Sequence, residues 1–155
     1  MSNHAFGADA GSANNLLFSL DHAGASVADL ERSIRFYCDA LGFAVEEQFR
    51  IPSAPVQGAV LHHTGGARIE LFHREGSLAG PAGDPIESTR WQGWFQVALG
   101  VADVRAAFAQ VVGRGAVAVK APFLAPDGRA WVAFVGDPDG NLIELIQRGD
   151  APGNA

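Results

Sequence analysis

One stretch of the chain decides the fold, Asp137-Pro138-Asp139-Gly140-Asn141-Leu142-Ile143-Glu144-Leu145-Ile146. Its first four residues place Pro and Gly as in a tight turn, and the Leu and Ile residues that follow predict a short, largely buried strand. Glu144 lies in the middle of this strand. Burying an ionised carboxylate is costly unless hydrogen bonds, a cation or a metal compensate the charge. The sequence therefore predicts a specific partner for Glu144.

An earlier stretch, Gly65-Gly66-Ala67-Arg68-Ile69-Glu70-Leu71-Phe72, carries the same Ile-Glu-Leu after a glycine. A shift of 74 positions places Glu70 on Glu144. The same shift places Val27-Ala28-Asp29-Leu30 on Val101-Ala102-Asp103-Val104, and His22 on Gln96. Chance does not readily explain several motifs that match at one ungapped offset, so we infer an internal repeat of two equivalent modules.

Each half of the repeat predicts one strand, one helix and three further strands. Apolar residues at helical spacing predict a helix from about Asp29, a candidate N-cap, to Gly42. The apolar stripe of Val104, Phe108 and Val111 predicts a second helix, which Gly113 and Gly115 end. Strands are expected at 16–27, 43–50, 56–63, 68–73, 91–101, 116–122, 129–135 and 141–147. The expected fold is α+β, a single domain of residues 16–148 with two tandem βαβββ modules, 16–73 and 91–148. A Gly- and Pro-rich linker of residues 74–90 joins them, after a flexible N-terminal extension of residues 1–15 and before a C-terminal tail of residues 149–155.

Composition excludes several classes of protein. A chain of 155 residues with 48% hydrophobic residues is long and apolar enough for one folded domain. The net charge of −6 and the scattered basic residues argue against a nucleic-acid partner. No apolar run reaches membrane-spanning length. The single cysteine, Cys38, allows no internal disulfide, so a reducing, cytoplasmic setting is expected.

The repeat assigns equivalent positions to four side chains that can bind metal. His22 and Glu70 lie on the first and last strands of one module, and Gln96 and Glu144 on those of the other. If the modules face each other, all four converge on one site. An imidazole nitrogen with carboxylate and amide oxygens suits a divalent metal such as Zn, Ni, Co, Mn or Fe, and the absence of thiolate ligands argues against structural zinc. The alternative is structural: a hydrogen-bonded histidine, and glutamates paired with nearby arginines.

The segments 20–24 and 27–37, together with 137–145, resemble the opening and closing motifs of the vicinal oxygen chelate superfamily, which includes glyoxalase I, bleomycin-resistance proteins and extradiol dioxygenases. The resemblance implies that the two modules curl into half-barrels and cup a metal held by His22, Glu70, Gln96 and Glu144. The ligand types resemble those of glyoxalase I, whereas the dioxygenases and fosfomycin-resistance enzymes have a second histidine in place of Gln96. Ser26 and Arg74 stand where glyoxalase I commonly has Arg and Asn, so strict dependence on glutathione is not implied.

The function expected from the sequence is that of a metal-dependent lyase or isomerase of glyoxalase type, which acts on a small carbonyl or vicinal-oxygen substrate through an enolate-like intermediate. Glu144 or Glu70 would act as general base. Four residues are candidates for the substrate pocket: Arg68, Trp94, Arg129 and Trp131. The alternatives are a non-catalytic binding protein like the bleomycin-resistance group, and an epimerase or dioxygenase of the same superfamily. A homodimer is expected, although a monomer whose modules fold on each other fits the sequence equally well.

Overall fold

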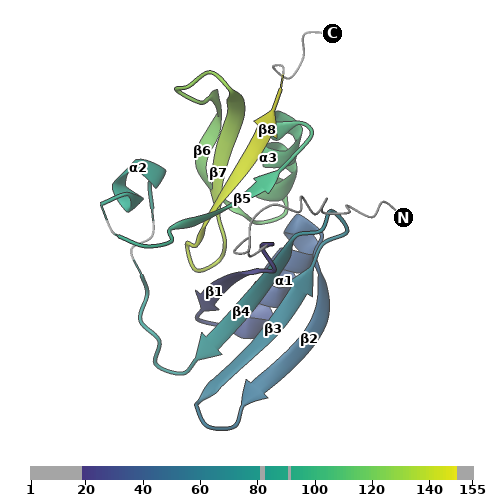
Figure 1. The fold of residues 1–155 in the computed structure, drawn as a ribbon, viewed down its shortest axis with the longest axis vertical. Coiled ribbons are helices and arrows are strands. Elements are labelled where there is room, and N and C mark those ends of the chain that lie inside the picture. The colour runs from purple at the N-terminus through teal and green to yellow at the C-terminus, as the bar shows by residue number, and fades with distance from the viewer. Residues whose placement is uncertain (1–18, 81–82, 91, 150–155) are drawn as a thin grey trace, which may run out of the picture.

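The computed structural model describes residues 19–80, 83–90 and 92–149, and it contains the two expected modules (Figure 1). The N-terminal module comprises β1 (Ala23–Val27), α1 (Leu30–Leu41), β2 (Ala44–Ile51), β3 (Val56–His62) and β4 (Arg68–Arg74). The C-terminal module comprises β5 (Gln96–Gly100), α3 (Val104–Gly113), β6 (Val117–Leu124), β7 (Ala130–Gly136) and β8 (Leu142–Arg148). The α+β class and the repeated βαβββ order are therefore confirmed.

Each module has its own four-stranded sheet, and the two sheets have the same topology. Their strand orders are β1-β4-β3-β2 and β5-β8-β7-β6. In both, the first strand of the module pairs in parallel with the last, so that Gly24 lies beside Glu70 and Ala98 lies beside Glu144. This pairing follows from the helix crossover between strands, and it brings the predicted ligands of each module together.

The helix boundaries agree with the capping residues in the sequence. Asp29 caps α1 by accepting a hydrogen bond from the Arg32 backbone N–H, and Asp103 caps α3 in the same way. Gly42 ends α1 in the left-handed conformation, with φ of 75°, which a residue with a side chain adopts only at a cost.

The structure differs from the sequence expectation around the linker and at the first strand of each module. The segment expected to be a linker contains a short helix, α2 (Pro85–Ser88), capped by Asp84. Four residues are too few to show a helical period, although an aspartate followed by proline is a start signal. Strands β1 and β5 begin at Ala23 and Gln96, later than expected, because the described residues directly before them, 19–22 and 92–95, are not part of a strand. The expected extension, most of the tail and residues 16–18 and 91 lie outside the described residues.

A hydrophobic core shared by both modules holds them together. It includes residues on the helix-facing sides of both sheets, among them Leu61, Leu71, Ile143 and Leu145, all almost fully buried. Helices α1 and α3 pack against each other at its centre. In the described part of the chain, no helix is both long and apolar enough to cross a membrane.

A polar latch, formed by the turn of residues 137–141 against the start of α1, reinforces this contact between modules. The buried carboxylate of Asp137 accepts hydrogen bonds from the backbone N–H groups of Asp139 and Asn141, both at 2.9 Å, and from the Tyr37 hydroxyl at 3.2 Å. Burial and the neighbouring charge of Asp137 raise the pKa of Tyr37 well above its usual range. The same hydroxyl therefore stays protonated and donates.

Asp139 supplies the second half of the latch. Its carboxylate accepts from the Ala28 backbone N–H at 3.2 Å and from the Ser33 hydroxyl at 3.4 Å, and it forms an ion pair with Arg32. The Asn141 side chain donates to the Ser26 carbonyl at 3.4 Å. All of these contacts join the last turn of the C-terminal module to the N-terminal module.

We expect Asp137→Ala to lower the free energy of unfolding by about 2–4 kcal/mol, because it leaves buried donors, including the Tyr37 hydroxyl, without their acceptor. Urea unfolding monitored by circular dichroism measures the loss. Asp127→Ala is the matched control: Asp127 accepts from the Arg129 backbone N–H in an exposed turn, so its removal should cost less than about 1 kcal/mol. Equal losses in the two variants would contradict the latch.

Candidate functional site

The N-terminal module contains the first half of the candidate site, which we call the N half-site, His22 and Glu70. Ile69 and Leu71 on β4 are buried against the helix side of the sheet. Because side chains alternate along a strand, Glu70 points to the opposite, open face of the sheet. His22 directly precedes β1, the neighbouring strand, and its Nε2 lies 3.0 Å from Glu70 Oε2. The sequence prediction that this pair lies together is consistent with that geometry.

Charged side chains surround the outer side of His22. Asp21 Oδ1 lies 2.8 Å from His22 Nδ1, and Arg68 lies 3.5 Å from the other oxygen of Asp21. Arg68 also forms a bidentate ion pair with Glu46 on β2. The hydrogen bond with Asp21, together with the nearby Glu70 charge, raises the pKa of His22, and the same hydrogen bond lowers the pKa of Asp21.

The position of His22 between two carboxylates bears on what it can bind. If Nδ1 of the neutral imidazole is protonated and donates a hydrogen bond to Asp21, the lone pair of Nε2 points to a carboxylate oxygen of Glu70 only 3.0 Å away. Two lone pairs at that distance repel, so a proton or a metal cation has to lie between them. The carboxylate-to-histidine hydrogen bond is also the arrangement that orients histidine ligands in metal sites.

The second half of the candidate site, the C half-site of Gln96 and Glu144, occupies the equivalent place in the other module. The Gln96 side-chain amide donates to Glu144 Oε2 at 2.7 Å. Phe134 lies opposite Glu144 across the β7–β8 pairing and belongs to a buried apolar cluster. Burial raises the pKa of the Glu144 carboxyl, while Arg148 and the Gln96 hydrogen bond act in the opposite direction. The predicted partner of Glu144 within the chain is thus Gln96.

The two half-sites do not join within one chain. Among the described residues, no three or more histidine, cysteine, aspartate or glutamate side chains are grouped closely enough to hold a metal. The reason lies in the packing of the modules: α1 contacts α3, and the latch fixes this arrangement. The structure therefore brings together His22 with Glu70 and Gln96 with Glu144, but not all four.

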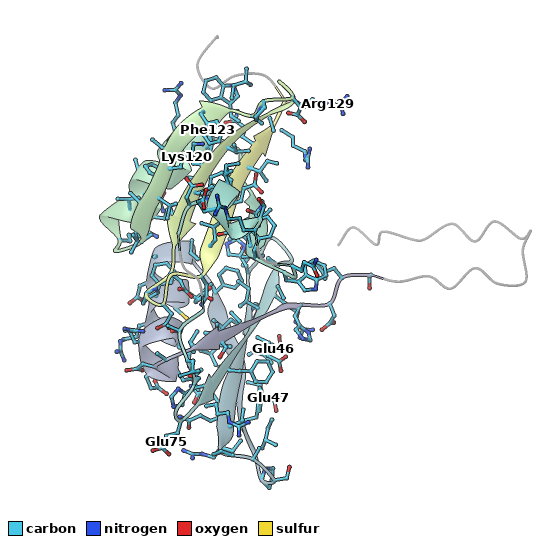
Figure 2. The ribbon with its side chains drawn as sticks, turned by 90° about the vertical axis from the view of Figure 1, so that its left-hand side faces the viewer. Glu46, Glu47, Glu75, Lys120, Phe123 and Arg129 are labelled. Atoms are coloured by element: carbon cyan, nitrogen blue, oxygen red, sulfur yellow. The ribbon has the colours of Figure 1, made fainter. Side chains whose placement is uncertain are left out.

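The four residues considered for the substrate pocket lie in different places. Arg68 lies beside the N half-site, paired with Asp21 and Glu46. Trp94 is fully exposed two residues before Gln96. Trp131 packs into the shared core on the helix side, where Arg105 of α3 lies 4.9 Å from its ring, and this face of the sheet is opposite to that of Glu144. Arg129 lies at the far tip of the C-terminal module, in the β6–β7 turn (Figure 2).

Two residues near the half-sites escaped sequence reasoning: Asp21 and Glu46. Asp21 had a signal, because an acidic residue directly before a candidate histidine ligand can reach its second nitrogen. Glu46 had none, because its contact with Arg68 depends on an irregularity in the β2–β3 pairing between Val45 and Glu47.

The donor atoms of the two half-sites fit a divalent metal of the zinc-to-manganese group. One imidazole nitrogen, two carboxylates and one amide oxygen make a mixed nitrogen and oxygen set, which is typical of catalytic rather than structural sites. Each half-site alone would supply two ligands, so the mixed set of four would need one half-site of each kind.

Comparison with known proteins agrees with this fold. The model of the family described as "Glyoxalase/Bleomycin resistance protein/Dioxygenase superfamily" matches residues 19–145. A probable lactoylglutathione lyase of Synechocystis is 33% identical over 129 residues, which cover 81% of this chain and 92% of that protein. The crystal structure of glyoxalase I from Zea mays has a TM-score of 0.63 and 27% identity, over 85% of this chain and 45% of the maize chain. A glyoxalase family protein from Bacillus cereus shares the fold, with a TM-score of 0.70 at 19% identity, over 90% of this chain and 100% of that chain.

Proposed function

Because the chain belongs to the glyoxalase/bleomycin resistance protein/dioxygenase superfamily, with lactoylglutathione lyases among its relatives at about 30% identity, we propose that it is a divalent-metal-dependent lyase or isomerase of glyoxalase I type. The observation that carries the proposal is the repetition of one arrangement: a nitrogen- or amide-bearing side chain beside a glutamate, at equivalent positions on the open faces of both sheets. A structural role for one such pair is common, but two pairs at repeat-related positions indicate a shared ligand.

The proposed ligands are His22 through Nε2, Glu70 and Glu144 through carboxylate oxygens, and Gln96 through its amide oxygen. When bound, a divalent metal supplies Lewis-acid polarisation of a carbonyl oxygen. Glu144 takes the proton from the carbon beside that carbonyl and returns it to the neighbouring carbon. Phe134 excludes water from one side of this carboxylate, which makes it a stronger base than a hydrated one. Asp21 holds the His22 ring in the orientation that directs Nε2 to the site.

We propose that two chains complete the site, with the N half-site of one chain facing the C half-site of the other. Charge supports this pairing of unlike modules. Glu46 and Glu47 lie on β2, whereas the repeat places Lys120 of β6 at the position equivalent to Glu46 (Figure 2). Because Arg68 already compensates Glu46, the charge that remains on β2 is that of Glu47. Two N-terminal modules face to face would oppose Glu47 of both chains, while an N-terminal module facing a C-terminal module opposes Glu47 and Lys120.

Exposed apolar residues beside the half-sites support the same assembly. Leu20, two residues before His22, and Trp94, two residues before Gln96, occupy equivalent positions in the repeat and are both strongly exposed. Large apolar side chains exposed next to a candidate site are typical of surfaces that a partner covers. A second copy of this chain covers both in one symmetric interface.

For the substrate, we propose a small α-carbonyl compound whose conversion does not strictly depend on glutathione. Glyoxalase I commonly has an Arg and an Asn that contact glutathione, and this chain has Ser26 and Arg74 at those two positions. Both residues belong to the open side or the end of the N-terminal sheet. The test compares turnover of methylglyoxal with glutathione, with a small neutral thiol, and without thiol, using protein loaded in turn with Zn, Ni, Co, Mn and Fe. No turnover with any metal would overturn the proposed activity.

A binding protein without catalysis is the rival function, and the same preparation distinguishes it. A metal-dependent enzyme loses activity after treatment with a chelator and regains it when metal is added back. A sequestering protein instead binds its ligand equally well without metal, and quenching of tryptophan fluorescence, chiefly from the exposed Trp94, reports that binding. Ligand binding unaffected by the chelator, in protein that turns over no substrate, would favour the rival.

We expect Asp21→Asn to weaken metal binding by about 10–100-fold, because the asparagine amide does not hold His22 as the carboxylate does. Competition with a chromophoric chelator measures the affinity. Glu87→Gln is the matched control, since Glu87 forms a salt bridge with Arg90 on the surface segment around α2. If both variants bind metal as tightly as the unmodified protein, Asp21 has no part in the site.

A further inference from the structure

A cavity of about 510 Å³ lies between the modules, away from both half-sites. Its walls come from the C-terminal end of α1, from the turn of residues 63–67 that joins β3 to β4, and from α3 with the end of β5. None of His22, Glu70, Gln96 and Glu144 lines it. The function proposed above therefore leaves this cavity unexplained.

The internal repeat explains where the cavity comes from. The shift of 74 positions that relates the modules also relates the latch to this cavity. Every latch residue that donates or accepts through its side chain has an equivalent that is smaller or apolar, apart from His63. The equivalences are Asp137 to His63, Asp139 to Gly65, Asn141 to Ala67, Ser33 to Ala107, Arg32 to Ala106 and Tyr37 to Val111.

The cavity thus occupies the position that the repeat relates to the latch, without the side chains that fill the latch. Of these equivalents, His63, Gly65, Ala67, Ala107 and Val111 line it. In the latch, the carboxylates of Asp137 and Asp139 occupy the space between the turn and the helix. In the cavity, Gly65 stands in place of Asp139 and contributes no side chain, and the His63 ring packs beside it, with Nδ1 3.0 Å from where a Cβ at Gly65 would lie. The repeat therefore indicates a place built for a carboxylate that this chain does not itself supply.

The charges around the cavity agree with this chemistry. Arg114 and His63 line it, and none of the described residues that line it is an aspartate or a glutamate, although the chain as a whole carries a charge of −6. Arg114 donates to the Asp39 carbonyl at 3.3 Å. With the Gln110 amide oriented so that its oxygen faces the guanidinium, Arg114 also donates to Gln110, at 3.1 and 3.2 Å, so a bound carboxylate takes the place of that amide oxygen. His63 Nδ1 accepts from the Gly65 backbone N–H at 2.9 Å, so the proton of neutral imidazole lies on Nε2, which can donate.

Apart from Gln110, the rest of the wall is apolar and includes Phe43, Leu99, Val101 and Leu145. An apolar wall with one or two fixed polar groups is the usual form of a small-molecule site, and the volume lies in the range of such sites. We propose that this cavity binds a small monocarboxylate with an apolar chain, whose carboxylate contacts Arg114 and the His63 Nε2–H. A cation is disfavoured by Arg114, and a phosphate by the apolar wall.

Titration of ¹⁵N-labelled protein with hexanoate tests the proposal, with hexanol and hexylammonium as neutral and cationic analogues of the same chain length. Hexanoate is expected to give saturable shifts of the amide signals of Gly65, Gly100 and Ala107, which border the cavity. Hexanol is expected to bind about tenfold more weakly or worse, because it forms no charge-assisted hydrogen bond, and hexylammonium is expected not to bind.

Two variants make the site assignment specific. Arg114→Gln should weaken hexanoate binding about tenfold, and Ala107→Phe should abolish it by filling the cavity. Arg35→Gln is the matched control, because Arg35 is exposed on α1 and does not line the cavity. The proposal is overturned if hexanoate gives no saturable shifts, if its shifts lie elsewhere, or if Arg114→Gln binds it as tightly as Arg35→Gln. No half-site residue lines the cavity, so the two proposals are tested separately. Hexanoate can bind to a protein that turns over no substrate, and an active enzyme can fail to bind hexanoate.

Discussion

Replacing Glu144 with glutamine is expected to lower kcat by about 10²–10⁴-fold while the protein still binds its metal. Glutamine has nearly the same shape and keeps a side-chain oxygen that can act as a ligand, but it cannot accept a proton from carbon. General base catalysis contributes about that factor in enzymes of this kind. Steady-state turnover of methylglyoxal with a thiol measures kcat, and elemental analysis of the purified variant measures the metal content.

Two further variants give this result its meaning. Glu75→Gln changes an exposed carboxylate beyond the end of β4, far from the Glu144 strand, and should leave kcat within about twofold of the unmodified protein (Figure 2). Glu70→Gln tests the other candidate base. We assign the base to Glu144 because Phe134 faces it, whereas the equivalent neighbour of Glu70 is the smaller Val60. A larger loss of kcat in Glu70→Gln than in Glu144→Gln would reverse the assignment.

The part of the fold that depends on local signals was predictable from the sequence. The caps Asp29 and Gly42 and the apolar stripe between them define α1 because capping and amphipathic spacing are properties of neighbouring residues. The repeat extended this prediction, because each strand expected in one module predicts an equivalent strand in the other. Helix α2 was missed because Pro85–Ser88 is shorter than the period that would reveal it.

The face on which a side chain lies was harder to predict where a strand is buried on both sides. Almost every residue of β7 is buried, so the alternation that normally separates core from open face is absent. Trp131 was therefore considered for the substrate pocket, and it lies on the helix side against Arg105. Alternation survives in β4, where Ile69 and Leu71 are buried and Glu70 between them is less so, and there the orientation of Glu70 followed from the sequence.

The pairing of ligands within each module was predictable, but the separation of the two pairs was not. Parallel pairing of the first and last strands follows from the module pattern, and it places His22 beside Glu70. Whether the modules then close on each other depends on the α1–α3 contact and on the latch at Asp137. The latch contacts join residues 100 or more positions apart and the helices are also distant in sequence, so no local pattern in the sequence encodes either contact.

Mixing two inactive variants is expected to restore activity if the site is shared between chains. The first variant, His22→Ala with Glu70→Ala, lacks the N half-site, and the second, Gln96→Ala with Glu144→Ala, lacks the C half-site. Each alone forms dimers without a complete ligand set and should be inactive. In a mixed dimer, one site combines both damaged half-sites, and the other combines both intact ones.

The expected recovery follows from counting sites. Random exchange of subunits makes about half of the dimers mixed, and each mixed dimer has one intact site of two, so activity should return to about a quarter of that of the unmodified protein. Exchange is started by mild denaturation and dilution, and light scattering confirms that dimers re-form. The control mixes the first variant with itself under the same treatment.

If each chain instead formed a complete site from its own two modules, every chain in the mixture would still lack one half-site, and no activity would return. Recovery therefore depends on the one feature that the α1–α3 packing imposes, the separation of the His22–Glu70 pair from the Gln96–Glu144 pair within a chain.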